Sequence, residues 1–174
     1  MQGRAARRHG GLAVADTDVD GDLDVVFVHN GSTQTLYGGP GCYVRNDGLP
    51  RMFDITDQFG ADLGSDNRYF TPILADFNQD MLPDLHVAVD FYMDFHCHNI
   101  GNGVFKDVTT QVGTTNTGAD MGVAVGDIEN DGDLDMYSTN INIGVLYVND
   151  GTGKFQDEAN PRGVQSWGNN TTVG

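Results

Sequence analysis

Short apolar runs dominate the hydrophobic pattern of this chain. In the last third, residues 122–127, 134–140, 143–149 and 154–158 alternate apolar and polar side chains or are rich in β-branched residues. Glycine-rich and Asn-Asp-Gly breaks separate these runs, as expected of tight turns between strands. No stretch sustains a helical period between capping residues. The pattern predicts an all-β protein, with four short antiparallel strands over residues 122–158.

The same pattern occurs three times. Residues 11–30, 71–90 and 121–140 each consist of an apolar run, an acidic loop and a second apolar run. The loops start at Asp16, Asp76 and Asp127, which are 60 and 51 residues apart. An asparagine follows each loop at a similar spacing, at Asn46, Asn99 and Asn149. Two landmarks that recur in the same order indicate a repeat architecture.

Four antiparallel strands in roughly 50 residues are typical of one blade of a β-propeller. We therefore expect a basic segment at 1–10, blades at 11–60, 61–112 and 113–162, and the start of an incomplete fourth blade at 163–174. A β-sandwich or an open solenoid of hairpins would fit the strand lengths as well. The acidic loop falls at the same point of each four-strand unit, and this favours the propeller section of about three blades.

Three blades are fewer than the four to eight that close a propeller. Exposed blade faces and strand edges would invite association. Two expectations follow: the chain is a fragment of a longer protein, or several copies complete a ring, for example two chains forming six blades. We favour the fragment.

Charge narrows the choice of partners. The formal net charge is −16, and the three loops hold more than half of the 25 acidic residues. Such a chain should repel nucleic acid and anionic membrane surfaces and attract divalent cations. No apolar run is long enough to span a bilayer, so we expect no membrane insertion.

The acidic loops suit a hard cation. Ca²⁺ takes six to eight oxygen ligands, and alternate acidic residues in a tight loop can turn their carboxylates toward one point. The side-chain candidates occupy loop positions 1, 3, 5 and 9: Asp16, Asp18, Asp20 and Asp24; Asp76, Asn78, Asp80 and Asp84; Asp127, Glu129, Asp131 and Asp135. We expect up to three Ca²⁺ ions with a structural role, because a fully ligated ion leaves no position for substrate.

The loops differ at two positions. Glycine at position 6 permits a sharp turn in the first and third loops, whereas Met81 replaces it in the second, where Pro83 also stiffens the approach to Asp84. We expect the second site to be the weakest or differently shaped. Glu129 is one methylene longer than aspartate, so its ligation should be altered or mediated by water.

An EF-hand is excluded. That motif needs a bidentate Glu at position 12 and flanking helices, but position 12 here is Phe27, Val87 or Ser138 and the flanks are strand-like. A simpler alternative is that the aspartates only solvate turns. The concentration of charge in the loops argues against it.

The D-x-D-x-D-G-x-x-D pattern of the loops, with LYVNDGTGKFQDEA (146–159) and GNGVFKDVT (101–109), resembles the FG-GAP/VCBS repeat family of calcium-loop propeller blades, which also occur in integrin α chains. The resemblance implies that position 7 supplies a backbone carbonyl, here from Asp22, Leu82 and Asp133. It also implies a secreted or extracellular setting and a protein or carbohydrate ligand, as in adhesion. Glycosylation patterns at Asn30, Asn169 and Asn170 agree only weakly with that setting.

An enzymatic alternative stays open. Similar calcium-loop propellers occur in some polysaccharide lyases and phospholipases, so the chain could be a fragment of an enzyme or of an enzyme-associated domain. The sequence has no G-x-S-x-G, phosphate-binding loop or HExxH motif. This favours a binding module.

Two further groups are candidates for chemistry. Asp94, His96 and His98 alternate along a predicted strand and would share a face, where they either hold a transition metal such as Zn²⁺ or simply fill the strand. Cys42 and Cys97 lie on the same face of equivalent strands, so we expect buried free thiols in place of a disulfide.

Overall fold

The computed structural model describes residues 9–29, 41–48, 52–58, 60, 68–141 and 143–165. Within these residues, twelve strands form three four-stranded antiparallel sheets, each built from four consecutive strands in chain order. Within the described residues, the only helical segments are the 3₁₀ turn η1 (Thr56–Gln58) and the short helix α1 (Thr109–Val112). No helix in this part of the chain is long and apolar enough to cross a membrane.

Each sheet falls within one repeat, apart from two residues at the start of the first. Blade 1 contains β1 (His9–Ala15), β2 (Asp24–His29), β3 (Gly41–Asn46) and β4 (Met52–Asp54). Blade 2 contains β5 (Arg68–Ala75), β6 (Asp84–Asp90), β7 (Phe95–Asn99) and β8 (Phe105–Asp107). Blade 3 contains β9 (Asp120–Gly126), β10 (Asp135–Asn140), β11 (Val145–Asn149) and β12 (Phe155–Asp157).

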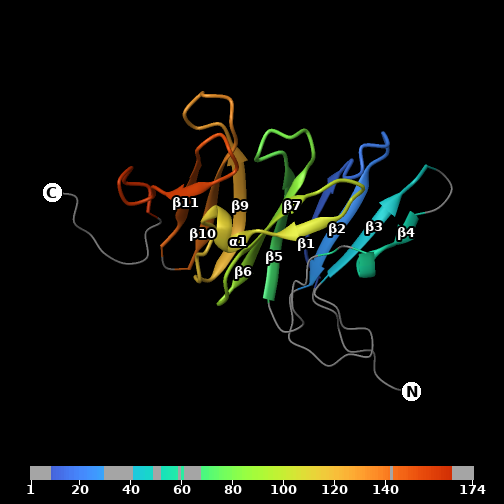
Figure 1. Ribbon diagram of the computed structural model, residues 1–174. Coiled ribbons are helices and arrows are strands. Elements are labelled where there is room, and N and C mark those ends of the chain that lie inside the picture. Colours follow the sequence, from blue (N-terminus) through green and yellow to red (C-terminus); the bar gives the residue numbers. More distant parts are fainter. Residues whose placement is uncertain are drawn as a thin grey trace, which may run out of the picture.

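The three blades stand side by side in chain order (Figure 1). Their first strands are neighbours, since β5 contacts both β1 and β9. The approach of β1 to β5 is close: a Cβ on Gly11 would lie 2.6 Å from the Phe70 carbonyl oxygen. Only glycine fits at such a distance. First strands gathered side by side, with the later strands fanning outward, are the arrangement of propeller blades, and the all-β fold expected from the sequence is confirmed.

Apolar side chains fill the spaces between blades. One buried cluster joins blade 1 to blade 2 and contains Val26, Val28, Tyr43, Leu85, Val87, Val89 and Cys97. A second joins blade 2 to blade 3 and contains Phe77, Val112, Met136, Val145, Tyr147 and Phe155. Because blade 2 has a neighbour on each side, every residue of β6 is buried. The two faces of β6 and β7 therefore belong to different interfaces.

Cys97 is free and buried in the first cluster, and burial raises the pKa of its thiol. The expected buried free thiol is thus confirmed at Cys97. The side chain of Cys42 and the glycosylation patterns at Asn30, Asn169 and Asn170 lie outside the described parts of the chain.

Candidate metal centres

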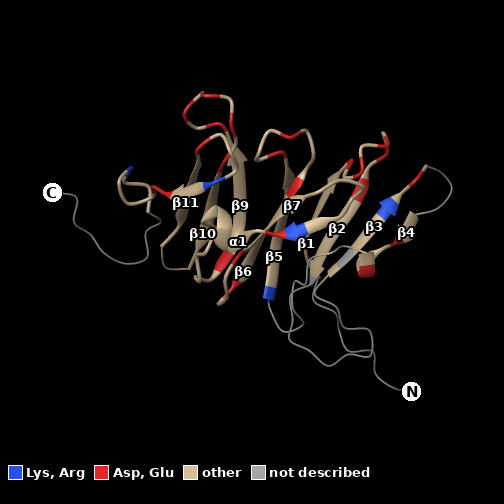
Figure 2. Cartoon of the chain, in the orientation of Figure 1, with Lys and Arg blue, Asp and Glu red and all other residues tan. Residues whose placement is uncertain are grey.

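The three acidic loops connect the first two strands of their blades and lie at one end of the sheets. Figure 2 shows acidic residues concentrated in these loops at the upper edge of the molecule. Because each blade contributes the same connection, the three sites predicted from sequence come to the same edge. They remain three separate loops.

The three loops share one backbone conformation. In each, the carboxylate at position 1 accepts hydrogen bonds from the backbone N–H groups of positions 5 and 6. Asp16, for example, accepts from Asp20 and Gly21, both at 3.0 Å. The corresponding bonds in the other loops are 2.9–3.2 Å long and are accepted by Asp76 and Asp127.

Positions 4 and 6 have positive φ angles in every loop. At position 6 the angles are 98° at Gly21, 69° at Met81 and 97° at Gly132. At position 4 they are 62° at Val19, 61° at Gln79 and 59° at Asn130. Met81 therefore follows the turn in the left-handed region, which disfavours a side chain. The alternative that the second loop is differently shaped is wrong for its backbone, whereas the expectation of weaker binding stays a prediction.

The aspartate at position 9 lies at the base of each loop. Asp24, Asp84 and Asp135 are fully buried. One oxygen of each accepts the backbone N–H of the asparagine that ends the third strand, at 2.9 Å from Asn46, Asn99 and Asn149 respectively. Position 9 is thus held by the blade itself, while the residues nearer the loop tip are more exposed.

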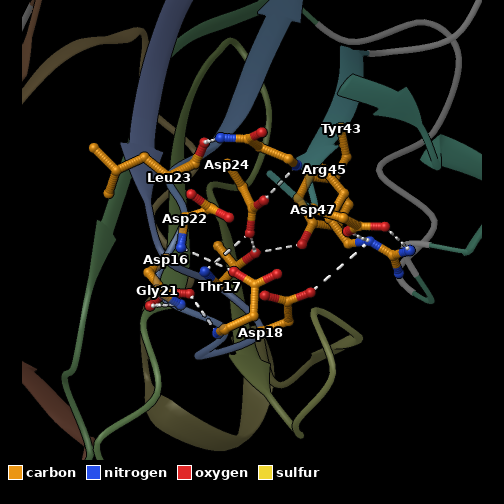
Figure 3. Close-up of polar contacts among 12 residues, drawn as sticks. Asp16, Thr17, Asp18, Gly21, Asp22, Leu23, Asp24, Tyr43, Arg45 and Asp47 are labelled. Atoms are coloured by element: carbon orange, nitrogen blue, oxygen red, sulfur yellow. Dashed lines mark hydrogen bonds and ion pairs between the residues drawn. The ribbon is translucent and has the colours of Figure 1, made fainter. Parts of the chain in front are cut away.

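The first loop brings its carboxylates together most closely. One oxygen each of Asp16, Asp18 and Asp20 lies within 4.8 Å of the other two. Figure 3 shows Asp16 and Asp18 of this group beside Asp24. Asp18 Oδ1 is buried and has no hydrogen-bond partner among the described residues. Burial, followed by repulsion from Asp24 and Asp20, raises the pKa of Asp18, although Arg45 at 3.8 Å opposes this effect. A cation at this point would relieve the repulsion.

The second loop carries less charge. Its amide at position 3 is bound within the loop: Asn78 Nδ2 donates to Asp80 Oδ2 at 3.0 Å. Met81 at the tip is 85% exposed, so its side chain gains nothing from packing to offset the backbone strain. Because of the lower charge and the strain at Met81, we still predict that the second loop binds a cation less tightly than the first and third loops.

The third loop is altered at Glu129, which forms an ion pair with Arg162 from the chain after β12. Burial, followed by the neighbouring Asp131, raises the pKa of Asp133 to about 6, and Asp133 Oδ1 is buried with no partner among the described residues. The family resemblance implied only a backbone role for Asp133. Its 6% exposure and acidic neighbours give its side chain a place in the site.

The recurring asparagines served only as landmarks in the sequence. In the structure two of them join neighbouring blades, because Asn99 Nδ2 donates to the carbonyl oxygen of Thr17 at 2.7 Å and Asn149 Nδ2 donates to that of Phe77 at 2.8 Å. Thr17 and Phe77 occupy position 2 of the preceding acidic loops. Their spacing of about 50 residues was the available signal, but periodicity alone does not identify a contact between repeats.

The histidine motif is only partly as expected. His96 and His98 share a face, but β7 starts at Phe95, after Asp94. Asp94 turns back to accept the Val89 N–H at 2.8 Å, so it is not the third member of this group. The carboxylate that joins His96 and His98 is Asp84, with one potential ligand atom of each residue within 4.8 Å of the others.

Comparison with known proteins gives three findings. No curated protein matches this chain. A lectin of Agrocybe aegerita that specifically recognises non-reducing terminal N-acetylglucosamine is similar in structure, with a TM-score of 0.47 and 22% sequence identity over 82% of this chain. This chain spans 36% of the lectin chain.

The family model of the FG-GAP-like repeat matches residues 76–138. This range starts at the first aspartate of the second acidic loop and ends within β10, just beyond the third loop. It therefore includes two of the three loops and three complete strands of blade 2. Residues 76–138 of this chain are therefore similar to the FG-GAP-like repeat family.

Proposed function

We propose that this chain is a calcium-binding section of a β-propeller, in which Ca²⁺ held by the acidic loops stabilises the blades. The observation that carries the proposal is the repeated loop geometry. In each loop, position 1 fixes the turn and position 9 is anchored below it, which leaves the oxygens at positions 3 and 5 near the tip. A loop of this kind with all-oxygen ligands suits Ca²⁺.

The charge distribution supports the proposal. Asp18 and Asp133 each place a buried carboxylate oxygen without a hydrogen-bond partner, among the described residues, beside other acidic groups. Burying an unpaired charge is costly, and a bound cation removes that cost. Ligands would come from positions 1, 3, 5 and 9, with backbone carbonyls of Asp22, Leu82 and Asp133 at position 7. The ion would bind the folded state and so stabilise it by mass action.

The proposed setting is extracellular. Calcium sites of extracellular modules have dissociation constants of about 10⁻⁴–10⁻³ M, which millimolar Ca²⁺ outside the cell can fill. We propose that the module works there, as part of a longer chain or an assembly, and presents its loop edge to a protein or carbohydrate ligand. A glycan array probed with the chain in Ca²⁺ tests the carbohydrate arm. Binding to no glycan would leave the protein arm of the proposal.

Thermal melting with EDTA, followed by added Ca²⁺, tests the metal. We expect the melting temperature to fall in EDTA and to recover with Ca²⁺. In calorimetric titrations, Asp20→Ala and Asp131→Ala should each lower the Ca²⁺ stoichiometry by about one, because each removes a central ligand. Asp57→Ala, which removes an exposed carboxylate outside the loops, is the matched control. An unchanged melting temperature would reject structural calcium.

A further inference from the structure

Blade 2 differs from its neighbours on the face that packs against blade 3. His86 on β6 pairs directly with His96 on β7, and Asp84 and His98 lie one pair further along the same face. One potential ligand atom each of Asp84, His96 and His98 lies within 4.8 Å of the other two. The set therefore results from strand register, with one carboxylate and two imidazoles converging from adjacent strands.

Three polar atoms at this place lack hydrogen-bond partners among the described residues: Asp84 Oδ2, His96 Nε2 and His98 Nε2. Asp84 and His96 are fully buried, and His98 is half-buried. Buried polar atoms without partners are rare, because leaving them unsatisfied costs the full desolvation penalty. Three unpaired polar atoms so close together indicate that a ligand binds between them.

The corresponding place in blade 1 is satisfied internally. There Asp24 Oδ2 accepts from the Thr17 backbone N–H at 3.0 Å and from the Thr17 hydroxyl, which in turn contacts the Tyr43 hydroxyl. In blade 2, Phe77 and His96 stand where blade 1 has Thr17 and Tyr43. The hydroxyls are therefore lost, and Asp84 faces imidazole nitrogens.

Both imidazoles are suited to bind a metal. Burial lowers the pKa of His96, with further lowering by His86 and His98, and burial also lowers the pKa of His98. Neutral imidazole offers a lone pair, as metal ligation requires. Phe77 and Phe155 pack against the His96 ring, with centroids 5.3 Å away in each case, and fix its plane.

A second layer of polar groups continues behind His96. Its Nδ1 lies 3.4 Å from His86 Nδ1, and His86 Nε2 lies 3.7 Å from Asp94 Oδ2. Metal-binding histidines usually hydrogen-bond through the ring nitrogen that does not bind the metal, which orients the ring, and here only the contact between His96 and His86 lies within hydrogen-bond distance. This arrangement leaves His96 Nε2 to point toward the set formed with Asp84 and His98.

We propose that Asp84, His96 and His98 form a binding site for a transition-metal dication of the Zn²⁺ class, which shares Asp84 with the second calcium loop and takes its two nitrogen ligands from β7. Two nitrogens and one carboxylate oxygen suit Zn²⁺, which takes these ligands in tetrahedral sites, with water at the fourth position. Tetrahedral bonds of about 2.0–2.2 Å place ligands roughly 3.4 Å apart, so a small inward shift of these side chains completes the geometry. Ca²⁺ prefers oxygen ligands and is excluded by the two nitrogens.

The test uses the full chain in saturating Ca²⁺, titrated with Zn²⁺ alone by calorimetry and with Co²⁺ alone by visible absorption. We expect one Zn²⁺ equivalent and the visible bands of tetrahedral Co²⁺. His96→Gln and His98→Gln should each weaken binding at least 100-fold and abolish the bands. His86→Gln, a change in the second layer, should keep the stoichiometry and weaken binding by about 10- to 100-fold.

Two control variants keep the test decisive. Asp57→Ala removes an exposed carboxylate outside the set and should leave the Co²⁺ spectrum unchanged, and Asp18→Asn alters only the first calcium loop. His98 is half-buried, so His98→Gln should remain folded, which circular dichroism checks. Absence of Zn²⁺ binding by the wild type, or an unchanged spectrum in folded His98→Gln, would overturn the proposal and would indicate that water satisfies these atoms. Calcium binding is scored separately, by the EDTA melt.

Discussion

Asn149 on β11 joins blade 3 to blade 2 by donating from its side-chain amide to the backbone carbonyl of Phe77 at 2.8 Å. The same amide donates to Leu134 within its own blade at 3.1 Å, and its carbonyl accepts the N–H groups of Gly151 and Gly153. One side chain therefore fixes a turn, the end of an acidic loop and the position of the next blade. Asn99 makes the equivalent contact with Thr17.

This contact predicts that Asn149→Asp lowers the free energy of unfolding. Aspartate keeps the accepting oxygens but loses both donated hydrogen bonds, each worth about 1 kcal/mol, and it leaves the buried Phe77 carbonyl and the partly buried Leu134 carbonyl unsatisfied. We expect a loss of roughly 2–4 kcal/mol in urea unfolding. Asn46→Asp is the matched control, because Asn46 Nδ2 makes only a 3.4 Å contact with Leu23 among the described residues. Equal losses in the two variants would contradict the role in joining blades.

Met81→Gly should stabilise the chain. Met81 has a φ angle of 69° and an 85% exposed side chain, so the residue is strained and its side chain makes little contact. Glycine removes a cost of about 1 kcal/mol, partly offset by the greater freedom of glycine in the unfolded chain. Unfolding in EDTA measures the effect without metal. Met81→Leu keeps the Cβ and should show no gain; a gain of the same size there would assign the effect to the side chain.

The acidic loops were predictable because their chemistry is local. A spacing of two residues between carboxylates and a turn at position 6 specify a loop wherever it occurs. The four strands of blade 3 also follow the predicted runs to within about two residues, because period-two alternation reads directly as a strand. Met81 replaces the turn glycine of the second loop, yet the backbone kept its shape, since Asp76 accepts hydrogen bonds from the N–H groups of positions 5 and 6 as Asp16 does.

Contacts that cross strands or blades were not predictable in this way. Asp84 was recognised as the end of a loop, but its position beside His98 depends on the register between β6 and β7, which no local pattern specifies. Alternation predicted that Asp94 belongs to the strand. In the structure it lies in the turn before β7, where its carboxylate accepts a hydrogen bond from the Val89 N–H. Alternation of polar and apolar residues shows which face of a strand a side chain lies on. It does not show which residues of the neighbouring strand lie beside that side chain.

Tyr43 makes the stability depend on alkaline pH. Burial raises its pKa to about 12, from 10 in the unfolded chain, while the bond to the Thr17 hydroxyl lowers it. The unfolded state therefore loses this proton first as the pH rises. Titration of Tyr43 therefore leaves the free energy of unfolding unchanged below pH 10. Between pH 10 and 12 it lowers the free energy of unfolding by up to about 3 kcal/mol.

Urea unfolding at a series of pH values measures this dependence. Tyr43→Phe has no proton to lose, so its stability should fall less steeply than that of the wild type between pH 10 and 12. Thr17→Val removes the group that lowers the pKa and should keep or steepen the slope. Parallel slopes for the wild type and Tyr43→Phe would show that another group controls the alkaline transition.

Arg162 limits cation binding at the third loop. Its guanidinium pairs with Glu129 at loop position 3 and with Glu158 at 2.6 Å, so it competes with a metal for Glu129 and adds positive charge beside the site. Arg162→Gln should therefore tighten Ca²⁺ binding at this loop by roughly two- to fivefold, the range expected for an exposed ion pair. Calorimetry at physiological ionic strength measures the change. Lys106→Gln alters the net charge equally at a site on β8, away from the third loop. If both variants tightened binding to the same extent, the effect would come from net charge, and Glu129 would not be a ligand that Arg162 withholds.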